Sequence, residues 1–408
     1  MHADLTFDRA GRRPGPMERA ALRLLGRIGA GHLTLHRHDG TAVDFRGAEP
    51  GPQVAVKVNN PRLFRRLALG GDIALAEAYR DGDWDTADLT DLLTFGALNR
   101  DRLGEGLDGS VAMRAAARLV HALRRNSRAG ARRNIAAHYD LGNAFYAAWL
   151  DPSLTYSAGL FAADDDDLAA AQVRKYRRLA ELAAIGRDDH VLEIGCGWGG
   201  FALWAARTIG CRVTAITLSA AQAAHLRDAA ARAGLADRVA VRLQDYRDVD
   251  GRFDRIVSIE MLEAVGEANW AAYFAAVRTL LRPGGRAALQ VITIADARFA
   301  AYRRRVDFIQ RHIFPGGMLP SPSALRRHAA DSGLDWIAAS RHGEDYAATL
   351  VHWQRRFEAA APQVAALGFD ARFRRMWRYY LAYCEAGFRT GRIDLLQVAL
   401  ARPAEAGA

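Results

Sequence analysis

Short apolar runs alternate with amphipathic stretches through the second half of the chain. The apolar runs begin near residues 191, 211, 239, 253 and 281, and segments with helical spacing follow the first, second and fourth. Strands that alternate with helices form parallel sheets, whose loops gather at one edge. The pattern therefore predicts an α/β fold of the doubly wound, Rossmann-like kind in residues 126–408, with the α/β alternation starting near residue 135.

The first 125 residues show a different pattern. Residues 33–45 and 52–58 alternate as short strands, and residues 61–85 have helical spacing. Arginines are concentrated at 124–133, in a segment that we interpret as a basic linker. We expect residues 1–125 to form a smaller N-terminal α+β domain, which leads into this linker and associates with lipid or another partner.

A glycine-rich turn separates the first predicted strand from its helix. Residues 191–200 read VLEIGCGWGG, so that Gly195, Gly197 and Gly199 follow an apolar strand and Glu193 precedes the first glycine by two positions. A doubly wound sheet binds its cofactor at such a turn. A dinucleotide site or a tight structural turn would also use a G-x-G pair. The string E-x-G-C-G-x-G-G nevertheless resembles the first motif of class I methyltransferases, which bind S-adenosylmethionine (SAM).

Composition restricts the classes of partner. Half of the 408 residues are hydrophobic, and the formal net charge of +10 comes almost wholly from arginine. A basic balance indicates an anionic partner, either nucleic acid or a membrane face, although arginine-rich codon usage would give the same count. Residues 299–314 interleave arginines with aromatic and aliphatic residues, which suits either a membrane surface or an amphipathic helix packed on the sheet.

Other sequence features argue against membrane spans and metal centres. We find no apolar run long enough to span a bilayer, and the first residues lack the apolar core of a secretory signal. Three cysteines and the pair His36 and His38 lack the spacing of a metal site or a disulfide framework. We therefore expect a cytoplasmic protein without a metal.

Six motifs occur in order along the chain and together resemble one enzyme family. They are HYDLGNAFYAAWLDPSLTYSAGLF, VLEIGCGWGGFA, ITLSAAQ, LQDYRD, EMLEAVG and HIFPGGMLPS. The set resembles the cyclopropane-fatty-acyl-phospholipid synthases, including the mycolic acid cyclopropane synthases, over about residues 20–390. The resemblance implies a SAM-dependent enzyme that methylates the cis double bond of unsaturated phospholipid acyl chains. It also implies a peripheral position at the anionic inner face of the membrane and no nucleic-acid partner, and it leaves a homodimer open.

The predicted sheet and the resemblance together give a candidate SAM site. The site draws on the segment before the first strand, the glycine turn and the loops after the second and third strands. Its residues are Tyr156, Ser157, Glu193, Gly195, Cys196, Gly197, Trp198, Gly199, Thr217, Ser219, Gln222, Asp245 and Tyr246.

The resemblance also implies a proton acceptor, and here the sequence departs from the family. In ring-forming members a bound bicarbonate takes the proton and is held by a Cys, a Glu, a His and a Tyr. Glu263, Tyr346 and the backbone position of Ile292 match, whereas Ala158 replaces the Cys and Gln290 replaces the His. These two changes count against a bound bicarbonate.

Glu260 offers an alternative base. It follows the fourth predicted strand, at the edge of the sheet nearest the methyl group, where a carboxylate could take the proton directly. The other interpretation is that Glu260 only neutralises the sulfonium or an arginine. The candidate catalytic residues are thus Glu260, Glu263, Tyr346 and Gln290.

The site of proton loss decides the product. Loss from the added methyl closes a cyclopropane, whereas loss from a neighbouring carbon gives a branched alkene, so that the product is either a cyclopropane or a methyl- or methylene-branched chain. The missing Cys and His favour branching. Two other functions stay open: a non-catalytic lipid-binding paralogue, and a methyltransferase for RNA or a small molecule.

Overall fold

The computed structural model describes residues 13–104, 141–162 and 167–404. The described residues divide into two compact units. The first holds residues 13–104, 304–313 and 368–392, and the second holds the remainder. The expected boundary at 125 and the arginines at 124–133 lie outside the described residues. The first unit also includes residues 304–313 and 368–392, which the sequence pattern had assigned to the catalytic region at 126–408.

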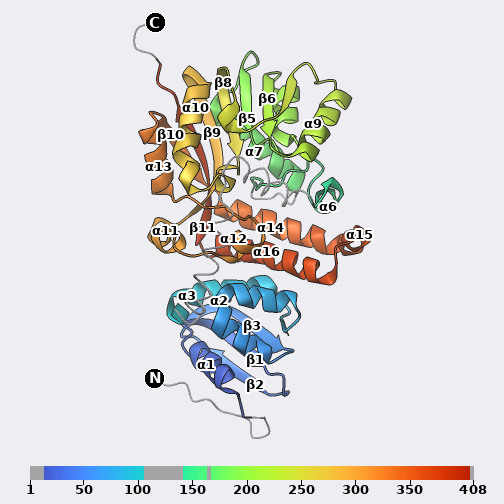
Figure 1. The fold of residues 1–408 in the computed structure, drawn as a ribbon, viewed down its shortest axis with the longest axis vertical. Coiled ribbons are helices and arrows are strands. Elements are labelled where there is room, and N and C mark those ends of the chain that lie inside the picture. The colour runs from blue at the N-terminus through green and yellow to red at the C-terminus, as the bar shows by residue number, and fades with distance from the viewer. Residues whose placement is uncertain (1–12, 105–140, 163–166, 405–408) are drawn as a thin grey trace. The chain divides into compact units, whose positions relative to one another are not determined.

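The second unit is built on a seven-stranded sheet with the order β10-β11-β9-β8-β5-β6-β7 (Figure 1). Its parallel part contains the five predicted strands, so the predicted α/β fold is confirmed. These strands are β5 (His190–Ile194), β6 (Arg212–Thr217), β7 (Val239–Leu243), β8 (Phe253–Ile259) and β9 (Leu281–Ile294).

Helices cover both faces of this sheet because its strands are apolar on both sides. Leu192 and Ile194 of β5 belong to a core with α10 (Trp270–Leu280) and α13 (Pro322–Asp331). Val191 belongs to a second core with three other helices. Those helices are α7 (Leu168–Ala183), α8 (Gly200–Thr208) and α9 (Ala220–Arg232). The alternation of side chains along β5 thus places the strand in the middle of three layers.

Two strands at one side of the sheet were not predicted. β11 (Ile393–Ala401) runs antiparallel between β9 and β10 (Asp335–Arg341), although it comes last in sequence. Periodicity within a short segment cannot reveal such a distant pairing. Between β10 and β11 the second unit also contains α14 (Gly343–Ala359) and α15 (Ala361–Ala366). Its other helices are α6 (Asn143–Ala147) and α11 (Asp296–Tyr302), with short 3₁₀ turns at Tyr246–Asp248, Leu262–Ala264 and Glu267–Asn269.

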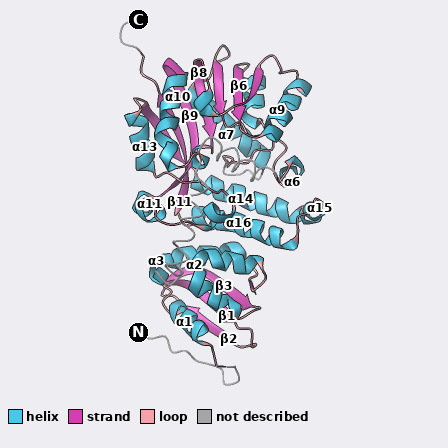
Figure 2. Cartoon of the chain, viewed as in Figure 1, coloured by secondary structure: helices cyan, strands magenta, loops and turns pink. Residues whose placement is uncertain are grey.

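The first unit has its own four-stranded sheet with the order β2-β1-β3-β4 (Figure 2). The predicted stretch 33–45 forms two antiparallel strands, β1 (Ala30–His36) and β2 (Ala42–Arg46), and residues 52–58 lie within β3 (Glu49–Val58). β4 is Trp84–Asp85. The helices of this unit are α1 (Pro16–Leu25), α2 (Arg62–Arg80), α3 (Leu89–Leu103), α12 (Phe308–His312) and α16 (Ala371–Arg389).

Helix α16 explains why the first unit is discontinuous in sequence. It packs against α2 and α3. Its Arg375 guanidinium lies 3.9 Å from the centroid of the Tyr79 ring and donates to the Tyr79 carbonyl at 2.6 Å and to Asp85 at 3.1 Å. Arg375 of α16 therefore serves packing within the first unit.

Three aromatic residues of the 299–314 segment pack against the protein core and are not exposed to solvent as a surface patch. Phe299 and Tyr302 lie against the core of the second unit, and Phe308 is buried in the first unit beside Tyr379. The arginines at 303–305 are exposed. The packing interpretation of this segment is therefore favoured for its apolar side chains. In the described part of the chain, none of the helices combines the length and apolar composition of a membrane span.

Candidate active site

The glycine turn after β5 has an open side and a closed side. Gly195, Gly197 and Gly199 adopt positive φ angles of 81°, 52° and 91°, which glycine adopts without strain. A Cβ at Gly199 would clash with the Leu226 side chain, whereas a Cβ at Gly197 would meet nothing within 4 Å. Gly199 therefore allows helix packing, and Gly197 borders space that a ligand can fill.

Glu193 brings a buried carboxylate to this turn. Its relative exposure is 2%, and within the described residues its Oε2 has no hydrogen-bond partner. Burial raises the pKa of Glu193 to about 8. A buried, half-satisfied carboxylate suits a cationic group such as the amino end of SAM. The glycine turn and Glu193 thus fit SAM, which would supply an electrophilic methyl group at the carboxyl ends of the strands.

The loops after β6 and β7 place the other candidate cofactor residues at the same edge. Thr217 donates to the Gln222 side chain at 2.8 Å, and Ser219 caps α9 by accepting from the Gln222 backbone N–H at 3.3 Å. Asp245 is bound by both ends of the Arg247 guanidinium, at 2.9 and 2.7 Å. The Tyr246 ring packs edge-on against Tyr273, 5.5 Å between centroids.

Candidate residues Tyr156 and Trp198 belong to a buried aromatic group. The Tyr146 ring lies 5.4 Å from Tyr156 and 4.8 Å from Trp198, and Trp353 lies 5.3 Å from Tyr156. The Trp198 indole also donates to Asn143 at 2.8 Å. Tyr146 and Trp353 were not among the predicted site residues. Tyr146 lies in the first motif, but nothing in its spacing distinguishes it from core aromatic residues.

The Glu260 carboxylate is the centre of a hydrogen-bonded cluster of neutral donors. Its Oε1 accepts from the Ala158 backbone N–H at 2.9 Å and from Gln290 Nε2 at 2.8 Å, and its Oε2 accepts from the Tyr346 hydroxyl at 2.7 Å. The cluster therefore gathers Ala158, Gln290 and Tyr346, the positions to which the resemblance assigns the Cys, His and Tyr of the anion site. Here they bind a side-chain carboxylate.

Glu260 also has an unusual backbone. Its φ angle is +49°, a left-handed conformation that costs a residue other than glycine about 1–2 kcal/mol. Its N–H donates to the Gln290 carbonyl at 2.8 Å, which continues the pairing of β8 and β9 by one residue. This turn re-aims the side chain from the end of β8 toward Ala158 and Tyr346.

Gln397 of β11 fixes the orientation of Gln290. The Gln397 amide donates to Gln290 Oε1 at 2.9 Å, so that the Gln290 Nε2 faces Glu260 and also donates to the Ala158 carbonyl at 3.3 Å. Both glutamines are fully buried. Gln397 was not among the predicted site residues, because the sequence pattern did not predict β11.

Glu263 has a different environment from Glu260. Its Oε1 accepts from the Ile292 backbone N–H, while its buried Oε2 lacks a hydrogen-bond partner in the described part of the chain. Burial, followed by the neighbouring Glu260 charge, raises the pKa of Glu263 to about 8. The two carboxyl groups thus have different surroundings, because Glu260 accepts three hydrogen bonds whereas Glu263 has one oxygen without a partner among the described residues.

We predict that Gly197→Ala lowers SAM affinity at least about tenfold, because its methyl group enters the open side of the turn and displaces ligand contacts. Gly234→Ala is the matched control. Gly234 has a similar φ of +66°, also has nothing within 4 Å, and lies at the far end of α9. Both variants should melt at similar temperatures, and only Gly197→Ala should bind SAM more weakly in calorimetry. Equal affinities would contradict the assigned cofactor site.

This chain is similar to known proteins over most of its length. The model of the family "Mycolic acid cyclopropane synthetase" matches residues 126–398. A tuberculostearic acid methyltransferase of Mycobacterium tuberculosis is 40% identical over 95% of this chain and 93% of its own. The cyclopropane-fatty-acyl-phospholipid synthase of Escherichia coli is 36% identical over 86% of this chain and 89% of its own.

Solved structures lead to the same family. The cyclopropane synthase MmaA2 of Mycobacterium tuberculosis is 29% identical, with a TM-score of 0.63 over 66% of this chain and 98% of that one. The mycolic acid cyclopropane synthase CmaA1, complexed with SAH and CTAB, is 31% identical, with a TM-score of 0.62 and the same coverage. The chain therefore belongs to the mycolic acid cyclopropane synthetase family and is a SAM-dependent methyltransferase of the kind that methylates lipid alkenes.

Proposed function

We propose that this enzyme methylates the cis double bond of an unsaturated phospholipid acyl chain, uses Glu260 as its base, and forms a branched product. The observation that supports the proposal is the cluster around Glu260. In the family resemblance the Cys, His and Tyr positions hold an exchangeable anion, and here Ala158, Gln290 and Tyr346 hold the Glu260 carboxylate. The relative that is 40% identical is named as a methyltransferase rather than as a cyclopropane synthase.

The reaction requires a dry site and a single base. SAM supplies an electrophilic methyl, and its transfer to the alkene leaves a positive charge on the acyl chain. The buried rings of Tyr146 and Trp353 and the half-buried ring of Tyr156 form an aromatic group that would exclude water and offer π faces to a cation. Glu260 then accepts a proton from a carbon next to the charge, and the C–H electron pair forms the new double bond.

Glu260 suits the role of base better than Glu263. Burial raises the pKa of Glu260, and hydrogen bonds from Tyr346, Ala158 and Gln290 oppose that rise. Glu263 has one such donor and a negative neighbour, so it holds its proton more firmly. Glu260 is therefore the carboxyl group of the two that gives up its proton more readily.

The product assay tests the proposed function directly. Wild-type enzyme is incubated with labelled SAM and liposomes of cis-unsaturated phospholipid, and the modified chains are analysed by mass spectrometry before and after mild hydrogenation. A branched alkene takes up hydrogen, whereas a cyclopropane does not. We expect a hydrogenatable product; a product that resists hydrogenation would refute branching, and SAM binding without any lipid product would indicate a non-catalytic paralogue.

Glu260→Gln tests the base. The substitution keeps the shape of the side chain and removes the basic carboxylate, so kcat should fall by about 10²–10⁴-fold while SAM affinity stays near wild type. Glu267→Gln is the control, because Glu267 lies in the following turn and pairs with Arg303 at the surface. Its kcat should remain at the wild-type level. Near-full turnover of Glu260→Gln would rule out this base.

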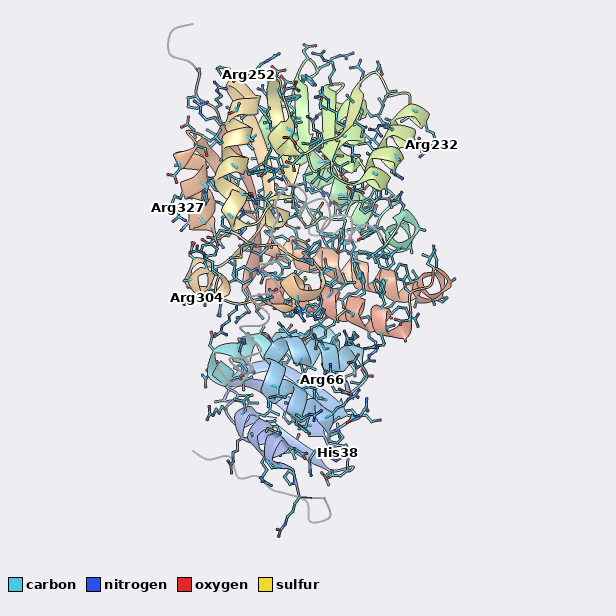
Figure 3. The ribbon with its side chains drawn as sticks, in the orientation of Figure 1. His38, Arg66, Arg232, Arg252, Arg304 and Arg327 are labelled. Carbon is cyan, nitrogen blue, oxygen red and sulfur yellow. The ribbon has the colours of Figure 1, made fainter. Side chains whose placement is uncertain are left out.

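We also propose electrostatic docking on anionic membranes, supported by the net charge of +10 and by the exposed arginines at 303–305. Figure 3 labels Arg304 in the first unit and Arg232 and Arg252 in the second. All three are exposed, which allows a test with equal charge change at different places.

The double variant Arg304→Glu/Arg305→Glu should bind anionic liposomes more weakly than Arg232→Glu/Arg252→Glu, which has the same net charge. Reversing two charges near an anionic surface weakens binding by about 1 kcal/mol or more per site, and added salt should reduce the difference. The difference in binding between the two double variants is measured by flotation of the proteins with neutral and anionic liposomes. Equal binding of both double variants would argue against docking through the 303–305 arginines.

A further inference from the structure

Lysine is rare in this chain, and one of its two lysines is fully buried. Among 56 lysine and arginine residues, only Lys57 and Lys175 are lysines. Lys57 is exposed on β3, whereas Lys175 on α7 has a relative exposure of 0%. Arginine is always charged and spreads its charge over a wide fork, while lysine is a compact cation that can lose its proton. A buried lysine in an arginine-rich chain therefore indicates a site that needs the smaller cation.

Lys175 forms a hydrogen bond to the segment of Ser157 and Ala158, which in turn binds the Glu260 carboxylate. Its Nζ donates to the Ser157 hydroxyl at 2.7 Å, and Gln172, one turn earlier on α7, donates to the Ser157 carbonyl at 2.8 Å. The next residue, Ala158, donates its backbone N–H to Glu260. Helix α7 thus fixes both the side chain and the carbonyl of Ser157, and with them the N–H that binds the carboxylate.

Three carboxyl groups from different elements act electrostatically on the Lys175 ammonium. Asp151 lies within the first sequence motif, Glu193 lies on β5, and Glu260 follows β8. Each of them interacts electrostatically with Lys175. Burial lowers the pKa of Lys175 to about 7, while Glu260 makes the largest contribution in the opposite direction. The same interaction opposes the rise that burial causes in the pKa of Glu260, after the hydrogen bonds from Tyr346, Ala158 and Gln290.

From this arrangement we infer that Lys175 is a positioning residue for the base: its ammonium holds Ser157 and Ala158 in place and keeps the Glu260 carboxylate ionised. The inference rests on the proposed role of Glu260 and adds the residue that sets its charge. The hydrogen bond acts on geometry, and the buried positive charge acts on protonation. These two contributions can be separated by mutation.

The pH dependence of kcat/KM separates the contribution of the Lys175 hydrogen bond from that of its positive charge. A base must be deprotonated, so activity falls as the pH drops through the pKa of Glu260. Lys175→Met removes the cation and should move this acidic limb upward by about one pH unit or more. Ser157→Ala removes the hydrogen-bond acceptor but keeps the cation, so it should lower kcat without moving the limb. Arg178→Met, an exposed change on the same helix, is the control for net charge and should match wild type. An unmoved limb in Lys175→Met would overturn the inference.

A second measurement covers the case in which Lys175→Met does not fold. Because the chain has two lysines, labelling lysine Cε with ¹³C gives two NMR signals, and the exposed Lys57 serves as the internal reference. Glu260→Gln removes a negative neighbour, so the Lys175 signal should titrate at lower pH than in the wild type. Unchanged titration would refute the coupling. If the titration shifts but Glu260→Gln retains full turnover, the coupling stands and the proposed base fails, so the two results are distinguishable.

Discussion

The hydrogen bonds to the Glu260 carboxylate join three distant parts of the chain. They come from Ala158 before α7, Gln290 on β9 and Tyr346 on α14. A carboxylate taken partly out of water requires such donors, because an unpaired buried charge costs several kcal/mol. Neutral donors favour the ionised form of the carboxyl group, which is the form that can accept a proton. Much of the surrounding architecture, including the left-handed backbone of Glu260 and the buried Gln290–Gln397 pair, serves this one group.

The sheet explains why these residues meet. β8 and β9 are parallel neighbours, so Glu260 after β8 lies beside Gln290 within β9. β11 enters antiparallel next to β9 and brings Gln397 against Gln290. On the other side of β8, β5 ends in Glu193 and the glycine turn. The glycine turn and the proposed base therefore lie after neighbouring strands at the carboxyl edge, where methyl transfer would require cofactor and base to be close.

Sequence patterns predicted the local part of this site and missed its distant part. The strand, glycine turn and helix at residues 190–208 follow from apolar periodicity and from glycine at positive φ, and both are properties of contiguous residues. Glu260 was predicted from its place after a strand. The roles of Gln397 and Lys175 depend on β11 pairing with β9 and on α7 packing beside Ser157, contacts that no short window of sequence contains. The same holds for the first unit, where α16 joins α2 and α3 from the far end of the chain.

Under the proposed function, a carboxylate built into the chain would remove the need for an exchangeable anion. The most direct test is the turnover of the wild-type enzyme on unsaturated phospholipid in buffer freed of carbon dioxide, with bicarbonate then added back. If Glu260 is the base, kcat should be the same with and without bicarbonate. Strong stimulation by bicarbonate would show that a bound anion still accepts the proton, and it would contradict the central role of Glu260.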